Sequence, residues 1–306
     1  EFADAKATWQ KLVGRAARLD LPDKGVRNGY YAALADIFIM SEPLPGDYVG
    51  VLPGTELYRC NNPIEAAIAC IVLDQAGLSV EAAEHYRIAL DSQNYDGCWS
   101  EQQGWARACW FAAGFKSWFV MEHYRITQDR AYLANVFPRM LASSRWQERA
   151  RQRTRVLEDG QKPLNYGLLP RGMGDGGLKD GDSLYGVFFP HNIWAVYADQ
   201  QTLAAAEELG LTAETAELRP IYDNARADLV DTIRRGAIAE DGYRWIPGVA
   251  GKTTGSRWGA LNATFPTQLI PRDDELITGT IRKMESKMSA GGIPLHTGWM
   301  EDGMWV

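Results

Sequence analysis

The amino-acid sequence predicts an all-α fold made of helical hairpins. Apolar residues recur at the spacing of about 3.6 residues that a helix with one buried face produces, and no run of alternating β-branched residues competes with them. Four of the loop-like segments also contain a similar phrase that begins with Asp-Gly, at Asp96-Gly97, Asp175-Gly176, Asp241-Gly242 and Asp302-Gly303. This recurrence, longer than an ordinary solenoid repeat, favours hairpins that close around an axis with their loops at one end.

Each expected helix has its own local signals. In residues 63–77, the apolar side chains of Ile64, Ile68 and Ile71 share one face, and Gly77 ends the helix. Ser79 is the expected N-cap of the next helix, because its hydroxyl can accept a hydrogen bond from the first-turn backbone. The expected helices cover residues 3–19, 27–41, 63–77, 79–90, 105–125, a segment beginning at Thr127, 188–209, 212–235 and 273–289.

Composition excludes several classes of function. The chain has 306 residues, 46% of them hydrophobic, and we expect a single domain over residues 1–306. Lys and Arg number 32 against 39 Asp and Glu, and the net charge of −7 argues against a nucleic-acid partner. The basic stretch 145–155 is most simply a solvated helix face with the loop that follows it. No apolar run reaches the roughly 18 residues that a membrane-spanning helix needs.

Cysteine and histidine usage narrows the chemistry further. The four cysteines, Cys60, Cys70, Cys98 and Cys109, are too few for a disulfide framework and form no CxxC pair. They are expected to be reduced thiols, which favours a cytoplasmic location. The four histidines lack the HExxH spacing of a catalytic zinc site. The sequence therefore predicts neither a metal nor another cofactor.

Tryptophans gather in the loop-like segments. Of the eleven in the chain, five stand beside Gly and Asp rather than on apolar helix faces: Trp99, Trp245, Trp258, Trp299 and Trp305. An indole offers a rigid flat face on which a sugar ring can stack, while nearby polar side chains bind the hydroxyls. The pattern points to a carbohydrate ligand, although the same indoles could instead fill the core at the ends of the helices.

Acidic residues in the same segments could supply catalysis. Hydrolysis of a glycosidic bond needs one carboxylic acid to protonate the leaving oxygen and one carboxylate to activate water or to attack the sugar. Each candidate could equally be a turn or cap residue, because Asp-Gly is first of all a turn signal. The candidates are Glu56, Asp96, Glu101, Asp175, Asp180, Asp182, Glu301 and Asp302.

His191 opens an expected helix after the glycine-rich segment that contains Asp175, and Asn192 and Trp194 accompany it. That segment fits neither a dinucleotide fingerprint, which must follow a strand and open a helix at once, nor the spacing of an EF-hand. His191 could form a structural hydrogen bond at the helix start, or it could contact a substrate.

A set of short motifs extends over nearly the whole chain. They are Leu21-Pro22-Asp23 with Asn28-Gly29-Tyr30-Tyr31, Pro53-Gly54 with Tyr58-Arg59, His123-Tyr124 through Tyr132-Leu133, Tyr166-Gly167-Leu168-Leu169-Pro170 with Asp175-Gly176, and Asn192-Ile193-Trp194-Ala195. With these motifs the sequence resembles the six-hairpin glycosidases, whose catalytic domain is an (α/α) barrel shared by glucoamylases, trehalases and α-L-rhamnosidases. The resemblance implies an (α/α) six-hairpin toroid or barrel and a bacterial carbohydrate-active hydrolase.

The resemblance also implies roles for particular residues. Tyr58 and Arg59 would line the pocket for the terminal sugar, and the segment around Asp175 would hold the acid. The chain departs from the family where Cys60 follows Arg59, because an Asp often stands there and binds sugar hydroxyls. Fewer helices are expected than six hairpins need, so the barrel should be incomplete at the C-terminus and lack its final hairpin. The chain would then be part of a longer enzyme, or a homodimer would complete the open barrel.

The first hypothesis is a glycoside hydrolase, inverting by resemblance, in which Asp175 or Glu56 donates the proton and Glu301 or Asp302 assists water. The alternatives are an inactive glycan-binding fragment, a polysaccharide lyase on the same barrel, and an isoprenoid cyclase, which Gln93-Asn94-Tyr95-Asp96-Gly97-Cys98-Trp99 resembles but without a DxDD acid motif. The expected substrate-binding residues are Tyr58, Arg59, Asn62, Asp96, Trp99, Glu101, Trp105, His191, Trp194, Trp245, His296 and Trp299.

Overall fold

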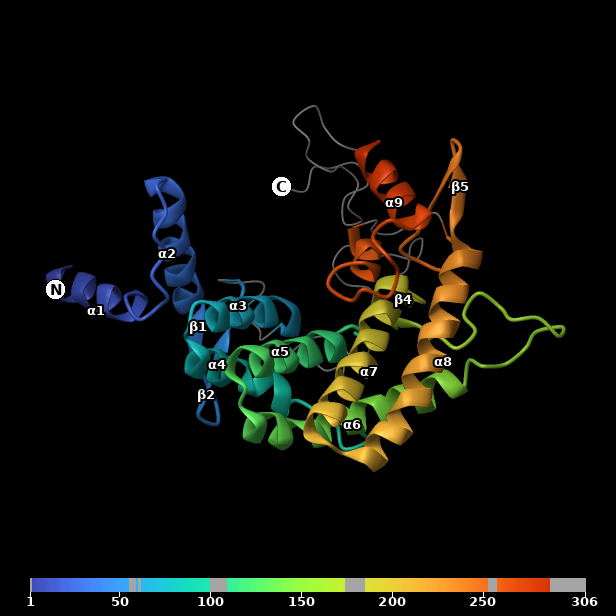
Figure 1. Ribbon diagram of the computed structural model, residues 1–306, viewed down its shortest axis with the longest axis horizontal. Helices are drawn as coiled ribbons and strands as arrows, with labels where there is room; N and C mark the ends of the chain where they lie inside the picture. The colour runs from blue at the N-terminus through green and yellow to red at the C-terminus, as the bar shows by residue number, and fades with distance from the viewer. Residues whose placement is uncertain are drawn as a thin grey trace. The chain divides into compact units, whose positions relative to one another are not determined.

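The computed structural model describes residues 2–54, 59, 62–99, 109–173, 185–252 and 258–286. Within these residues the chain forms nine α-helices, one short 3-10 helix and three two-stranded antiparallel sheets (Figure 1). Helices dominate, which confirms the prediction of an all-α fold. The contacts define two compact units, of which the first contains Glu1–Gln93 and Phe115–Val136 and the second contains most of the remaining chain. A single domain over residues 1–306 stays a prediction.

The first unit begins with helices whose starts are capped by side chains. Asp23 Oδ1 accepts hydrogen bonds from the backbone N–H groups of Gly25, at 2.7 Å, and Val26, at 3.2 Å. Asn62 Oδ1 accepts one from Ile64 N–H at 3.0 Å, and Pro63 follows at the first helical position. The elements are α1 (Phe2–Val13), α2 (Lys24–Ile39), β1 (Ser41–Leu44), β2 (Tyr48–Val51), α3 (Pro63–Gln75) and α4 (Ser79–Asp91).

Helices α5 (Ala112–Thr127) and α6 (Arg130–Gln152) have residues in both units. The chain breaks between them at Gln128, which has a φ of 58°. Asp129 then accepts a hydrogen bond from Tyr132 N–H at 2.8 Å and so caps α6. The prediction that Thr127 begins the second helix is wrong, because its hydroxyl donates to His123 C=O and ends α5 instead.

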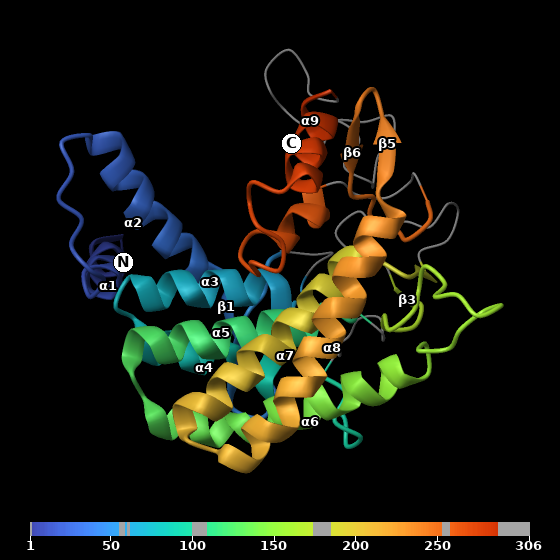
Figure 2. The same ribbon diagram turned by 45° about the vertical axis from the view of Figure 1, so that its right-hand side comes forward.

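The second unit is built around α7 (Phe189–Leu209), which packs against α8 (Thr212–Gly236) (Figures 1 and 2). Most side chains of α7 are buried, because apolar and small residues occupy nearly its whole circumference. Gly210 ends the helix in the left-handed region with a φ of 69°. The remaining elements are β3 (Gly172–Met173), β4 (Tyr185–Gly186), β5 (Ile238–Glu240), β6 (Tyr243–Trp245), the 3-10 helix η1 (Trp258–Ala263) and α9 (Glu275–Glu285).

Several predicted boundaries are wrong by part of a helix. Helix α1 ends at Val13, and α2 begins at Lys24 because Asp23 caps it. Leu78 is the N-cap of α4, so Ser79 is its first helical residue. Helix α9 begins at Glu275, because Asp274 caps its start at Leu276 N–H, and the last three residues of the predicted helix, 287–289, lie outside the described residues. Short strand pairs were not predicted, since two or three residues give no alternating pattern.

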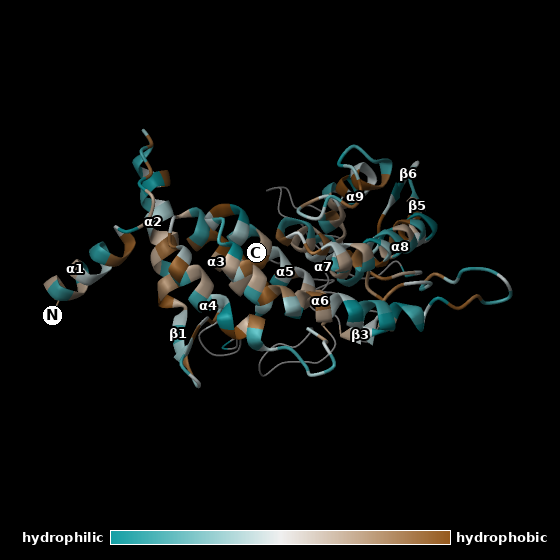
Figure 3. Ribbon diagram, turned by 60° about the horizontal axis from the view of Figure 1, so that its bottom comes forward, coloured by the Kyte–Doolittle hydropathy of each residue, from teal (hydrophilic) through white to brown (hydrophobic). Residues whose placement is uncertain are grey.

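The polar and apolar surfaces follow the sequence pattern. In Figure 3 the last turns of α6 are hydrophilic, as expected for the basic stretch. Arg151 within that stretch is nevertheless almost completely buried, which corrects the prediction of a solvated face at this position. Among the described residues, no helix is both long and apolar enough to span a bilayer.

Candidate functional site at the start of α7

All four residues expected to be catalytic lie outside the described residues, and their roles stay predictions. Five of the expected binding residues also lie outside them. Together these positions are Glu56, Tyr58, Glu101, Trp105, Asp175, His296, Trp299, Glu301 and Asp302. The structure describes the other expected binding residues, which are Arg59, Asn62, Asp96, Trp99, His191, Trp194 and Trp245.

In the first unit, Asn62 and Arg59 make local contacts. The side-chain oxygen of Asn62 caps α3, and its residue is buried. Arg59 is exposed, and its guanidinium pairs with Glu42 on β1. These contacts neither support nor oppose a role in sugar binding, which stays a prediction for both residues.

In the second unit, His191 lies in the first turn of α7 and is buried between two aromatic rings. Its ring centroid is 4.9 Å from those of Phe111 and Phe188. Only 1% of the residue is exposed, and neither ring nitrogen has a hydrogen-bond partner within the described residues. Burial lowers the pKa of His191 to about 3. The imidazole is therefore neutral near pH 7, and it can offer one donor and one acceptor to a ligand.

In the first unit, a second buried histidine, His123, does have a hydrogen-bond partner. His123 Nδ1 lies 2.9 Å from a carboxylate oxygen of Asp74, and both side chains are buried. The His123 ring also stacks on Phe119 and contacts Tyr132. His191 lacks any such carboxylate among the described residues. An unpaired buried polar group of this kind calls for a functional explanation.

Asn192 fixes the chain segment that precedes β3 against the start of α7. Its Oδ1 accepts a hydrogen bond from Leu169 N–H at 2.7 Å, and its Nδ2 donates to Phe188 C=O at 2.9 Å. The hydroxyl of Thr154 donates to Leu168 C=O at 2.6 Å and holds the same segment from the other side. The structure thus brings together two motifs that carry the family resemblance, 166–170 and 192–195.

Two half-buried indoles lie next to this segment. The ring centroids of Trp110 and Trp146 are 5.1 Å apart. Trp110 Nε1 donates to Pro170 C=O at 2.8 Å, and Trp146 Nε1 donates to Asp96 Oδ2 at 3.0 Å. Asp96, an expected binding residue, therefore holds one indole in place. Sequence reasoning missed this pair, because Trp146 lies in the middle of a helix and only the fold brings it beside Trp110.

Trp194 belongs to the same end of α7. Its Nε1 lies 3.2 Å from Asn262 Oδ1 in η1. A Cβ atom on Gly114 would lie only 2.4 Å from Trp194 C=O, so the first turn of α5 touches the backbone of α7 directly. Phe111, in the residues just before α5, packs against His191 at this close approach.

The remaining expected binding residues with indole rings are core residues. Trp99 is 1% exposed and Trp245 is 2% exposed. Trp245 Nε1 donates to Glu240 Oε2 at 2.9 Å, and the Lys283 ammonium lies 5.2 Å from the ring centroid. The burial of both indoles supports the alternative that they fill the core.

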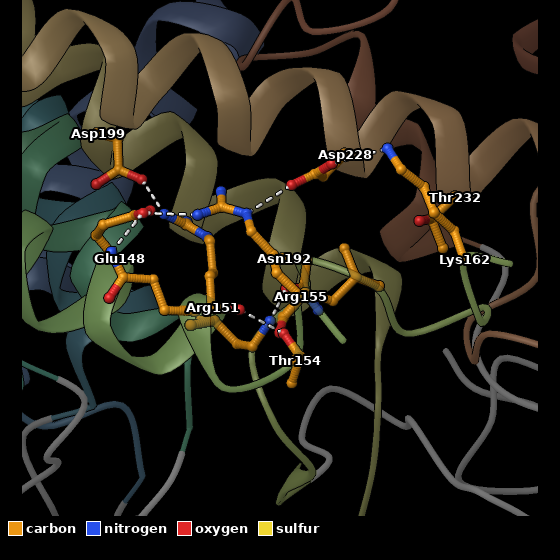
Figure 4. A network of polar contacts seen from close by, with 12 residues as sticks. Glu148, Arg151, Thr154, Arg155, Lys162, Asn192, Asp199, Asp228 and Thr232 are labelled. Carbon is orange, nitrogen blue, oxygen red and sulfur yellow. Dashed lines mark hydrogen bonds and ion pairs between the residues drawn. The ribbon is translucent and has the colours of Figure 1, made fainter. Parts of the chain in front are cut away.

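A network of polar side chains connects α6, α7 and α8 (Figure 4). Arg151 donates to Asp199 at 2.6 Å, and Arg155 contacts Glu148 at 2.6 Å and Asp228 at 2.9 Å. Burial raises the pKa of Asp199, although Arg151 opposes this effect. The network ties the end of α6 to its neighbours, and so it holds the segment containing Thr154 and Leu168 in place.

The chemistry of this site suits a neutral ligand rich in hydroxyl groups. It contains a neutral imidazole without a hydrogen-bond partner among the described residues, and two adjacent half-buried indoles. Within the described part of the chain, no cluster of three or more His, Cys, Asp or Glu side chains could hold a metal ion.

Comparison with known proteins identifies the fold. No protein-family model and no curated protein matches the sequence. Among solved structures, a glycosidase in complex with glucose is similar over 87% of this chain and 71% of its own, with a TM-score of 0.57 and 11% identity. The chain therefore shares the helical fold of this glycosidase. A Streptococcus pneumoniae protein from a family of metal-independent alpha-mannosidases, in a non-productive complex with alpha-1,6-mannobiose, is similar over 91% of this chain and 75% of its own, with a TM-score of 0.57 and 12% identity.

Proposed function

We propose that the protein is a hydrolase that cleaves glycosidic bonds with a pair of carboxylates. The observation that carries this proposal is the glycoside hydrolase fold, which extends over most of the chain. A fold alone does not determine a reaction, so the site at the start of α7 must support the same conclusion. It does so because adjacent indoles and a neutral imidazole suit a sugar better than an ion.

The proposed proton donor is Asp175, with Glu56 as the alternative. Asp175 comes two residues after Met173 in the sequence. Met173 on β3 pairs with Tyr185 on β4, and α7 begins shortly after β4. Met173 and Tyr185, the described residues that flank the segment containing Asp175, are therefore paired shortly before the start of α7, which supports this choice of donor. Glu301 or Asp302 is proposed to activate water, which would give inversion at the anomeric carbon.

Hydrolysis can be tested directly. The purified chain would be incubated with nitrophenyl glucosides, nitrophenyl mannosides and alpha-1,6-mannobiose, and released sugar would be measured. We expect release from at least one member of this panel, with the anomer of the first product read by NMR. Sugar binding without release would contradict hydrolysis and support the glycan-binding alternative. An unsaturated product that absorbs in the ultraviolet would instead indicate a lyase.

Replacing Asp175 with asparagine should lower the turnover number by about 100-fold, because general acid catalysis contributes at least roughly that factor. Asp159→Asn is the matched control, since Asp159 is an exposed turn residue that is also followed by glycine. The control should keep full turnover. Full turnover in Asp175→Asn would remove Asp175 from the role, and the same assay on Glu56→Gln would then test the alternative donor.

A further inference from the structure

A groove lies between the β5–β6 hairpin and one face of α9, which stand side by side in Figure 2. Its volume is about 460 Å³, within the range of roughly 300–1,000 Å³ that is typical of small-ligand sites. A Cβ atom on Gly279 would lie 1.8 Å from Arg244 C=O, so α9 touches the backbone of β6 at the base of the groove. None of the lining residues belongs to the site at the start of α7.

Polar and charged side chains form both walls. The hairpin contributes Glu240, Tyr243 and Arg244, and α9 contributes Glu275, Thr278 and Arg282. The three α9 residues share one face of the helix, because they are spaced by three and four positions. The groove is therefore built from one helix face and one hairpin, both within the second compact unit.

Most of the charges in the groove are already balanced. Glu240 pairs with Lys283, and Arg244 Nη1 lies 3.6 Å from Glu275 Oε1. Arg282 and the Tyr243 hydroxyl have no hydrogen-bond or ion-pair partner in the part of the chain that the structure describes. Donors on Arg282, an acceptor and donor on Tyr243, and lone pairs of the exposed Glu275 carboxylate are thus available to a ligand.

This arrangement selects one chemical class of ligand. The two glutamates and two arginines of the lining balance in charge, so the groove as a whole favours neither an anion nor a cation. The lining exposes apolar as well as polar surface, which suits a ring with both C–H faces and hydroxyl groups. A neutral molecule with many hydroxyl groups can use the guanidinium donors and carboxylate acceptors together, and its ring can lie on the face of Tyr243.

We propose that this groove is a second saccharide-binding site, separate from the candidate site at the start of α7, which holds part of a polymeric or oligomeric substrate. The choice of a saccharide among neutral polyols rests on the proposed function. The groove increases the affinity for long substrates and leaves the reaction of small glycosides unchanged.

The test compares polymer binding with the hydrolysis of small substrates. Affinity electrophoresis would measure the binding of the full chain to dextran and to yeast mannan. Arg282→Ala and Tyr243→Ala should each lower the affinity for the polymer that binds by about tenfold, the loss expected when one charged donor or one stacking ring is removed. Arg272→Ala and Tyr95→Ala are matched controls, because both residues are exposed and lie outside the groove.

The outcomes separate this proposal from the proposed function. Loss of polymer affinity in the groove variants, with unchanged release from nitrophenyl glycosides, supports the groove. Groove-dependent binding by a chain that releases no sugar would contradict hydrolysis but support the groove. Unchanged polymer affinity in Arg282→Ala, the variant on the exposed helix face, would overturn the groove whatever the hydrolysis assay finds, as would the absence of any polymer binding.

Discussion

Replacing His191 with phenylalanine is expected to make the protein markedly more resistant to acid. The native pKa of His191 is about 3, whereas an unfolded histidine has a pKa near 6.5. Between these pH values His191 is protonated in the unfolded state but not in the native state. The wild-type free energy of unfolding therefore falls as the pH is lowered from about 6.5 towards 3. The loss reaches the order of 4 kcal/mol at the acid end of this range.

Phenylalanine has no proton to bind, so His191→Phe should lack this component of the pH dependence. Urea unfolding of both proteins at several pH values between about 4 and 7 would measure the difference. Near pH 7 the variant should be as stable as the wild type or more stable by about 1–2 kcal/mol, because two unpaired ring nitrogens are removed from the interior. Parallel pH profiles for the two proteins would mean that the native ring accepts a proton and is not buried as described.

His191→Gln separates the stability effect from a role in binding. Glutamine cannot titrate, so it should also remove the acid sensitivity, but it keeps a donor and an acceptor in the site. If His191 binds a sugar hydroxyl, His191→Phe should raise KM more than His191→Gln does. A purely structural histidine would give equal KM values in both variants and in the wild type.

The sequence predicts the helices well because their signals are local. Periodic apolar residues and the stop at Gly77 act within a few residues, and the structure bears them out, because α3 ends at Gln75 and Gly77 has a φ of 79°. The predicted helix boundaries are wrong where two local signals compete. Thr127 looks like an N-cap in isolation, but its hydroxyl bonds back to His123 and the chain turns at Gln128 instead.

The candidate site is harder to predict, because it depends on contacts between distant segments. Trp110 and Trp146 become a pair only when α6 packs beside the residues that precede α5. Trp99 and Trp245 have the same loop-like surroundings in sequence, yet both are buried. Composition can thus indicate that indoles and carboxylates are abundant, but only the packing decides which of them a ligand could reach.

Arg151 illustrates the same point with a charge. It lies in a stretch of alternating basic residues that is typical of a solvated helix face, and Arg145 and Arg149 in that stretch are indeed exposed. Arg151 instead points to Asp199 on α7, and the side chains of the two residues are 1% and 0% exposed. Gln147 also donates to this carboxylate, at 2.9 Å. A lone basic residue gives no sign in the sequence that its partner lies on another helix.

Replacing Arg151 with methionine should therefore lower the free energy of unfolding by about 3–5 kcal/mol, the cost of leaving one buried charge without its partner. Arg145→Met on the same helix is the matched control. Arg145 forms two hydrogen bonds of 2.6 Å to Glu217, but both residues are exposed, and the loss should stay below about 1 kcal/mol. Equal losses in the two variants would contradict the buried pair.

The pH dependence of Arg151→Met identifies the cause of the loss. Burial already raises the pKa of Asp199, and removing the opposing arginine should raise it further. A raised native pKa means that the native state holds a proton which the unfolded state releases, so stability is present at low pH and is lost as the pH rises through that range. The destabilisation measured by urea unfolding should accordingly be smaller near pH 5 than near pH 7. Arg151→Met combined with Asp199→Leu should recover most of the lost stability, because no buried charge then remains.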